Sequence, residues 1–230
     1  MNKKLYAIVV AGGQGSRMKS ELPKQFIPLQ KKPILFHTLQ RFLEFPHPVE
    51  IILVLPEKEI QTWENISNNY NLNVKNVKII SGGASRFLSV KNGLASLPTS
   101  DGVVAIHDGV RPFLELSLLE KCYHVALEKG NAVAAVALKD SIRQVKEDGS
   151  SVSVNRNEYF LVQTPQVFNL SLIKNCYENA ASDHFTDDAS VAEQAGVGIN
   201  IVQGSYENIK ITTPEDLALA EAVLKNFRYQ

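Results

Sequence analysis

Short apolar runs alternate along the chain with amphipathic segments, a pattern typical of strands that alternate with helices. The runs contain many β-branched residues and few polar positions, and they cover residues 5–10, 50–55, 77–80, 102–107 and 132–137. Strands this apolar are buried on both faces of a sheet. The pattern therefore predicts an α/β fold with a mostly parallel sheet covered by helices.

Helical periodicity and capping signals fill the segments between and after these runs. Ser85 is placed as the N-cap of one helix, and Thr213, Pro214 and the acids Glu215 and Asp216 form a strong start for the last one. The predicted helices cover residues 33–44, 57–69, 85–97, 116–129 and 170–181, and two more open near residues 186–190 and at 213.

Residues 139–159 break the pattern. They form two polar, strand-like arms around Asp148-Gly149, a strong signal for a tight turn. A hairpin with so little apolar surface is marginal in water by itself. We expect it to lie against something, such as a second copy of the chain in a two-fold dimer, and the alternative is a frayed surface excursion.

The first strand runs into Ala11-Gly12-Gly13-Gln14-Gly15-Ser16-Arg17-Met18, followed by Pro23-Lys24-Gln25-Phe26. Glycines let backbone N–H groups approach a ligand closely, and Arg17 and Lys24 add two cations, so the loop is suited to a polyphosphate. The dinucleotide fingerprint fails because its third glycine position holds Met18, and the spacing does not fit the Walker pattern. The plain alternative is a tight turn between strand and helix.

Two more polar turns follow strands of the predicted sheet, at Gly82-Gly83 and at Asp108-Gly109. In parallel sheets, ligands bind beyond the carboxyl ends of the strands, so these turns should meet the glycine loop there. Lys210 lies on a short strand-like stretch before the last helix. It is either an edge-strand charge or, given its partners, a ligand contact.

Composition narrows the class of protein. The 230 residues are 44% hydrophobic, enough for one sizeable core, and 24 basic residues balance 24 acidic ones. This balance argues against general binding to nucleic acids or acidic membranes. No run reaches membrane-spanning length and the start lacks a signal-peptide pattern, so we expect a soluble, cytoplasmic protein. Cys122 and Cys176 are read as free buried thiols, with a disulfide as the open alternative.

Taken in order, these motifs resemble those of the 2-C-methyl-D-erythritol 4-phosphate cytidylyltransferase family. They are the glycine loop with Arg17, Pro23-Lys24-Gln25-Phe26, Gly82-Gly83 with Arg86, His107-Asp108-Gly109-Val110-Arg111-Pro112, Thr164-Pro165-Gln166, Thr186-Asp187-Asp188-Ala189-Ser190 and Asn208-Ile209-Lys210. The resemblance implies a single Rossmann-like domain over residues 1–230, with a β-arm at about 139–159 that crosses a homodimer. It also implies Mg²⁺, CTP and a polyol phosphate as ligands.

The resemblance also implies residue roles. Arg17, Lys24 and Lys210 would be catalytic, holding the triphosphate and its α-phosphorus. The nucleotide would be bound by Ala11, Gly12, Gly13, Gly15, Gly83, Ala84, Ser89, Asp108 and Gly109, with Asp108 also facing the metal. The polyol phosphate would be bound by Arg111, Ser141, Arg156, Thr164 and Thr186, where Ser141 and Arg156 would reach into the neighbouring subunit.

Plainer roles stay open for several of these residues. Arg111 and Arg156 could be surface ion-pair residues, Thr186 an N-cap and Asp108 a turn former. The chain also departs from the pattern, since Ala84 replaces a frequent acid and Ser141 a frequent threonine. The first departure leaves Ala84 with backbone contacts to the base.

The chemistry fits the residues independently. The nucleophile of nucleotidyl transfer is a phosphate oxygen that is largely ionised at neutral pH, because its second pKa is near ~6. No general base is needed, and the obstacle is repulsion between two polyanions, which fixed cations relieve. Two alternatives to the methylerythritol enzyme remain: a ribitol 5-phosphate cytidylyltransferase, and a CTP sensor without turnover.

Overall fold

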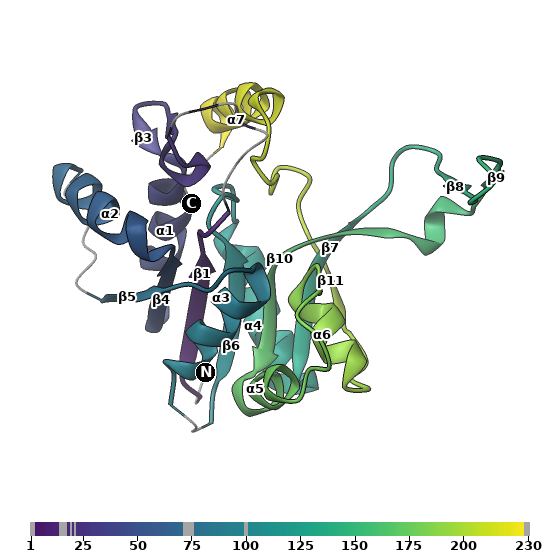
Figure 1. The fold of residues 1–230 in the computed structure, drawn as a ribbon, viewed down its shortest axis with the longest axis horizontal. Coiled ribbons are helices and arrows are strands. Elements are labelled where there is room, and N and C mark those ends of the chain that lie inside the picture. Colours follow the sequence, from purple (N-terminus) through teal and green to yellow (C-terminus); the bar gives the residue numbers. More distant parts are fainter. Residues whose placement is uncertain are drawn as a thin grey trace.

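The computed structural model describes residues 3–13, 18, 20, 22–70, 76–98 and 101–227. Its centre is a seven-stranded sheet in the order β11-β7-β10-β6-β1-β4-β5 (Figure 1). The strands are β1 (Leu5–Val10), β4 (Val49–Leu55), β5 (Val77–Ser81), β6 (Val103–Asp108), β7 (Asn131–Ala137), β10 (Phe160–Asn169) and β11 (Ile201–Gln203).

The register of the parallel strands places the polar turns together. Within the sheet, β1 pairs in parallel with β4 on one side and with β6 on the other, and Val10 lies opposite Val54 and Asp108. The glycine turn after Val10 and the turn at Asp108 therefore leave the sheet at the same edge. The predicted mostly parallel α/β sheet is confirmed.

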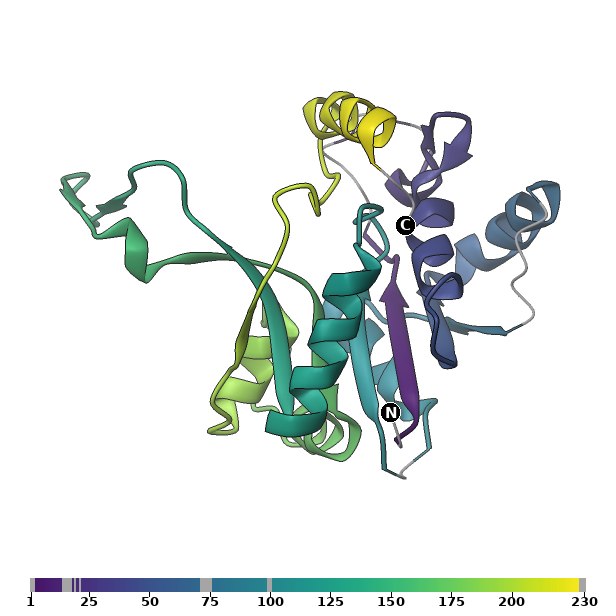
Figure 2. The ribbon, with the colours of Figure 1, turned by 180° about the vertical axis from the view of Figure 1, so that it is seen from behind.

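Helices cover both faces of the sheet (Figures 1 and 2). They are α1 (Ile34–Leu43), α2 (Glu57–Asn69), α3 (Arg86–Ala95), α4 (Leu116–Lys129), α5 (Leu170–Glu178), α6 (Asp188–Gln194) and α7 (Pro214–Asn226). One apolar core lies under α1, α2 and α4 and includes Leu39, Trp63 and Leu119. A second core lies under α3, α5 and α6. Within the described ranges, no helix has the length and apolar character needed to cross a membrane.

Strand β10 was not among the predicted elements. It runs antiparallel between β6 and β7, and its register against β7 shifts between Val162 and Gln166. Pro165 lies within that irregular stretch. A proline cannot donate a ladder hydrogen bond, so it argues against a central strand unless the pairing is interrupted around it. This interruption is why the sequence pattern did not reveal β10.

The arm projects away from the body of the fold (Figures 1 and 2). Its end is the short hairpin of β8 (Arg143–Val145) and β9 (Ser151–Ser153), joined through Asp148-Gly149. Gly149 has a φ of 80°, which glycine adopts without steric cost. The predicted hairpin is confirmed, and both Cys122 and Cys176 are buried and free, as expected.

A third apolar cluster joins α7 to the hairpin of β2 (Pro28–Leu29) and β3 (Lys32–Pro33). The start of α7 is a capping box in which Thr213 and Asp216 bond each other's backbone. The strand-like stretch predicted around Lys210 is wrong: residues 208–212 form no strand. Ile211 N–H donates to the Val110 carbonyl at 3.0 Å, and this bond ties the loop to the turn after β6 instead.

Candidate active site

A cavity of about 730 Å³ opens at the carboxyl ends of β1, β4, β5 and β6. Most of the lining comes from the turn after β1, the stretch that ends at Lys24, the start of α2 and the turn before α3, and Asp108, Val110 and Lys210 complete it. The lining side chains and backbone include those of Ala11, Gly12, Gly13, Lys24, Lys58, Glu59, Gly83, Ala84, Ser85, Arg86, Ser89, Asp108 and Lys210. Four of these are cations, which suits an anionic ligand.

Lys24 lies directly over Gly13. A Cβ added at Gly13 would come within 2.8 Å of both Cε and Nζ of Lys24, so a larger residue there would displace the end of the lysine side chain from this position. Lys24 begins a short 3₁₀ turn, Lys24–Phe26. The next residue, Gln25, is fully buried and donates from Nε2 to Glu59 at the start of α2. The lysine is therefore held at the rim by a buried neighbour.

The turn before α3 is fixed by two hydroxyl groups. Ser85 is the N-cap, as predicted, and its Oγ accepts from Leu88 N–H at 3.1 Å. The buried Ser89 hydroxyl accepts from Gly83 N–H at 3.1 Å and donates to the Ser85 carbonyl at 2.9 Å. A Cβ at Gly83 would clash with Leu88. These contacts give the Gly83–Ser85 backbone one conformation, open to the cavity.

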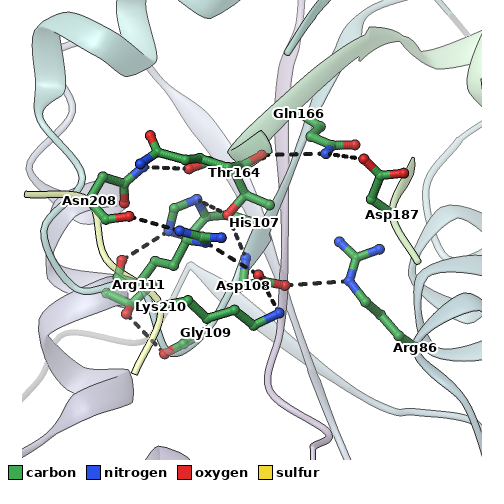
Figure 3. A network of polar contacts seen from close by, with 12 residues as sticks. Arg86, His107, Asp108, Gly109, Arg111, Thr164, Gln166, Asp187, Asn208 and Lys210 are labelled. Atoms are coloured by element: carbon green, nitrogen blue, oxygen red, sulfur yellow. Dashed lines mark hydrogen bonds and ion pairs between the residues drawn. The ribbon is translucent and has the colours of Figure 1, made fainter. Parts of the chain in front are cut away.

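Asp108 collects three cations around one carboxylate. Lys210 Nζ lies 2.9 Å from Oδ2, Arg111 Nε 3.4 Å from Oδ2, and Arg86 Nε 3.4 Å from Oδ1. Figure 3 shows Arg86 on one side of Asp108, with Arg111 and Lys210 on the other. Burial by itself would raise the pKa of Asp108, but Arg86, Lys210 and Arg111 hold it well below its usual range. The carboxylate is thus ionised at any pH near neutrality.

A chain of hydrogen bonds supports Asp108 from behind (Figure 3). Asp108 N–H donates to Thr164 Oγ1 at 3.1 Å, and that hydroxyl lies 3.1 Å from His107 Nδ1. His107 Nε2 lies 3.0 Å from the Arg111 carbonyl. Burial lowers the pKa of His107 to about 4, so the ring is neutral and has one donor. Only Nε2–H satisfies both contacts, which leaves Nδ1 to accept from Thr164.

The same chain of contacts reaches the loop that carries Lys210. Arg111 Nη1 donates to the Asn208 carbonyl at 2.8 Å, and Asn208 Nδ2 donates to the Thr164 carbonyl at 2.7 Å. Lys210 is therefore fixed from two sides, by Asp108 at its tip and by Asn208 in its backbone.

A sequence model of the 2-C-methyl-D-erythritol 4-phosphate cytidylyltransferase family matches residues 5–226. The chain belongs to this family. A relative of that name from Bacteroides fragilis is 47% identical over 218 residues, covering 95% of this chain and 98% of its own. One from Syntrophus aciditrophicus is 44% identical over 229 residues, covering 98% of this chain and 97% of its own.

A solved structure agrees with this family assignment. The 4-diphosphocytidyl-2C-methyl-D-erythritol synthase of Anaerococcus prevotii matches with a TM-score of 0.84 at 31% identity, covering 97% of this chain and 96% of its own. The Rossmann-like fold implied by the resemblance to the cytidylyltransferase family is confirmed.

Most of the residues predicted for a cytidylyltransferase site meet at the cavity. The structure places Ala11, Gly12, Gly13, Lys24, Gly83, Ala84, Ser89, Asp108 and Lys210 on its lining. Three more lie just behind it: Arg111 and Thr164 contact Asp108, and Gly109 donates from N–H to the Val10 carbonyl at 2.8 Å. Ser89 is a support for the turn at Gly83, since its hydroxyl bonds that turn.

Other predicted site residues lie elsewhere. Ser141 and Arg156 are exposed on the arm, and Thr186 is exposed before α6. Among the described residues, none of these three lines the cavity. The N-cap of α6 is Asp187, so Thr186 is not the cap, and Arg111 is buried, so it is not a surface ion-pair residue. Gly15 and Arg17 fall outside the described residues.

Sequence reasoning gave no role to several residues that build the site. Arg86, His107 and Asn208 stood inside recognised motifs, but their partners are distant in sequence and no local pattern names them. Asp188 follows Thr186-Asp187, and its role as the partner of Arg86 is evident only from its burial beside that arginine in the structure. Lys58, on the cavity rim, had no signal other than its place in the first turn of α2.

Proposed function

We propose that this chain transfers a cytidylyl group from CTP to 2-C-methyl-D-erythritol 4-phosphate and releases pyrophosphate. The observation that carries the proposal is that Lys210, held 2.9 Å from Asp108, lines the same cavity as Lys24 and the glycine turn. Cations on two sides of one cavity suit a reaction in which two polyanions must approach in line.

In this proposal the acceptor's phosphate oxygen attacks the α-phosphorus of CTP, and the bond from that phosphorus to the bridging oxygen breaks. The acceptor phosphate is already ionised, since its second pKa is near ~6. Lys24 with Arg17 would hold the triphosphate, and Lys210 would face the α-phosphorus. The turn at Gly83 and Ala84 would receive the base through backbone groups. Arg111, Thr164 and Thr186 would bind the acceptor.

Mg²⁺ fits this arrangement as a partner of the triphosphate. Magnesium is commonly held by one or two carboxylates together with substrate phosphates, and Asp108 and Glu59 are the carboxylates among the described lining residues. Those residues hold no group of three or more acidic, histidine or cysteine side chains arranged for a metal. Asp108 would hold the ion jointly with CTP, and the ion would offset charge on the phosphates.

Two other functions remain as outcomes of the test. The family match and the named relatives favour the methylerythritol substrate over ribitol 5-phosphate. They also favour an enzyme over a CTP sensor, which would bind nucleotide without releasing pyrophosphate.

The experiment supplies purified protein with CTP, Mg²⁺ and either methylerythritol 4-phosphate or ribitol 5-phosphate, and follows pyrophosphate release. Release with methylerythritol phosphate supports the proposal. Release with ribitol phosphate alone, or CTP binding without release with either acceptor, overturns it.

We further propose that the chain acts as one nucleotidyltransferase domain whose arm joins two copies into a homodimer. The arm and its base expose apolar side chains, namely Val145, Val152, Tyr159, Phe160, Leu161 and Val162. An isolated exposed ribbon of this kind gains stability when a second copy covers it. Ser141 and Arg156 would then contribute to the partner's cavity.

A further inference from the structure

Arg86 lies between two carboxylates that belong to different parts of the site. Its Nη1 and Nη2 donate to Asp188 Oδ1 and Oδ2 at 2.9 and 2.7 Å. Its Nε faces Asp108, the contact that Figure 3 shows. Two parallel bonds between a guanidinium and a carboxylate fix angle as well as distance. The pair therefore sets how its two segments lie relative to each other.

Asp188 makes this pair costly to separate. Its carboxylate is fully buried, and its remaining hydrogen bond comes from the Tyr177 hydroxyl on α5, at 2.6 Å. Burial raises the pKa of Tyr177, and Asp188 raises it further, so the hydroxyl keeps its proton and donates. Separating a buried carboxylate from its cationic partner strongly destabilises the folded protein, because it leaves an uncompensated buried charge. Arg86 and Asp188 therefore stay together in the folded chain.

The pair links the lining of the cavity, through Arg86, to the start of α6. Arg86 is the first residue of α3, directly after the turn at Gly83–Ser85. Asp188 is the first residue of α6, two positions after Thr186. The start of α6 is also tied to β10, because Gln166 Nε2 donates to Asp187 Oδ2 at 3.0 Å and Gln166 Oε1 accepts from Ala189 N–H at 2.7 Å.

We propose that Arg86 is a positioning residue for cytidylyl transfer. Through Asp188 it sets the separation between the turn that receives the nucleotide and the Thr186 segment that receives the acceptor. This inference rests on the proposed function, because it needs two substrates that must be aligned. Alignment carries a large share of the rate in such reactions, and a misplacement of ~1 Å can cost a factor of about 100.

A direct role is the competing account. Arg86 lines the cavity and its side chain is 23% exposed, so its guanidinium could itself bind a CTP phosphate. The two accounts differ in which substrate is affected. A direct contact would make CTP binding depend on the arginine, whereas a positioning role would place the loss on use of the acceptor.

The test compares Arg86→Lys, which keeps the charge but not the paired geometry, with the wild-type protein. CTP binding, measured by calorimetry without acceptor, should stay within about threefold, while the KM for methylerythritol 4-phosphate rises about 10-fold or more. Asp188→Asn should do the same, and the double variant should be no worse than either single one, because both changes remove one interaction. Arg41→Lys is the control, since Arg41 is also an arginine paired with a carboxylate, that of Glu44, but lies outside the cavity lining.

A loss of CTP affinity greater than about tenfold in Arg86→Lys would overturn the positioning role in favour of direct contact. Additive losses in the double variant, or changes equal to those of Arg41→Lys, would also overturn it. If Arg86→Lys does not fold, Tyr177→Phe removes the hydroxyl that orients Asp188 toward Arg86 and so loosens the pair. It should raise the acceptor KM in the same direction, and an unchanged KM refutes the proposal. Failure of the proposed function would show separately, as wild-type protein that binds CTP but releases no pyrophosphate.

Discussion

Lys210 Nζ lies 2.9 Å from Asp108 Oδ2, on a loop whose backbone is itself bonded to Arg111 through Asn208. The lysine is thus held at the carboxyl edge of the sheet by groups of the protein. A cation fixed in advance needs no reorganisation when charge develops on a reacting phosphate. The surrounding ion pairs also leave a net charge of one positive unit, which favours an anionic ligand. They join three cations, Arg86, Arg111 and Lys210, to two carboxylates, Asp108 and Asp188.

Lys210→Ala should lower kcat/KM for pyrophosphate release by a factor of about 100 to 1,000, the effect of losing one preorganised donor. Asp108 keeps Arg86 and Arg111 as partners, and the Lys210 side chain is 39% exposed, so the melting temperature should change little. Lys121→Ala, on the exposed side of α4, is the control. A kcat/KM within a factor of two to three of the wild-type value would show that Lys210 contributes little to stabilising the transition state, and would remove it from the mechanism.

Lys24→Ala and Arg17→Ala should each abolish turnover while the far-ultraviolet circular dichroism spectrum stays that of the wild type. Lys24 lies against Gly13 at the mouth of the cavity, where a triphosphate would need it. Because the loop is proposed to bind CTP, CTP affinity measured by calorimetry should also fall. Near-normal rates in both variants would contradict the proposed role of the glycine loop.

Much of this fold could be predicted because each strand and helix is encoded locally. The helix at 57–69 and the helix at 116–129 have the predicted bounds, and Ser85 and Thr213 cap where expected. Strand β10 escaped prediction because Pro165 interrupts its pattern, and its pairing with β6 and β7 depends on distant residues.

The site divides along the same line. Motifs identified the residues on the cavity rim, such as Lys24 and Gly83, because glycine turns and nearby cations are visible in sequence. The motifs could not identify which of these residues contact each other. The paired residues Arg86 and Asp188 are 102 positions apart, and Thr164 and His107 are 57 positions apart. Such pairs depend on burial, which lowers the pKa of His107 to about 4 and has no local signature.

His107 should make the folded state less stable in mild acid. Its pKa falls from 6.5 to about 4 on folding because of burial, so between these values the unfolded chain binds a proton that the folded chain does not. The free energy of unfolding should therefore fall as pH decreases through this window, by about 3 kcal/mol from this residue. His107→Gln can still accept from Thr164 and donate to the Arg111 carbonyl, and it should remove that part of the slope.

Urea unfolding of both proteins between about pH 7.5 and pH 4 measures the difference. Burial also lowers the pKa of His37, but His37 is present in both proteins and its effect cancels. The carboxylate of Asp108 contributes only at lower pH, since its folded pKa lies below its ordinary value. Parallel slopes for the wild type and His107→Gln would show that His107 is not buried in neutral form.

Thr213→Ala should cost about 1 kcal/mol of stability, the usual cost of losing an N-cap side chain. Thr213 Oγ1 accepts from Asp216 N–H at 3.3 Å, and Asp216 Oδ2 accepts from Thr213 N–H at 2.9 Å. The cap lies three positions after Lys210, so kcat should fall as well. Glu215→Ala, in the same first turn but outside the capping box, is the control for thermal unfolding. Equal melting temperatures for the two variants would contradict the role of the cap.

A mixture of two inactive proteins tests whether the arm acts across a dimer. Lys24 lines the cavity of its own chain, whereas Arg156 is exposed on the arm, outside the described lining. If Arg156 serves the partner's cavity, Lys24→Ala and Arg156→Ala should each be inactive alone. A mixed dimer would contain one complete site, with Lys24 from one chain and Arg156 from the other. Equal mixing with free subunit exchange should then restore about a quarter of wild-type activity, because half the dimers are mixed and each has one working site of two.

Arg143→Ala, at the end of the same arm, controls for damage to the hairpin. The result counts only if light scattering shows dimers and their subunits exchange. If activity then does not recover, Arg156 serves the site of its own chain or neither of the two sites.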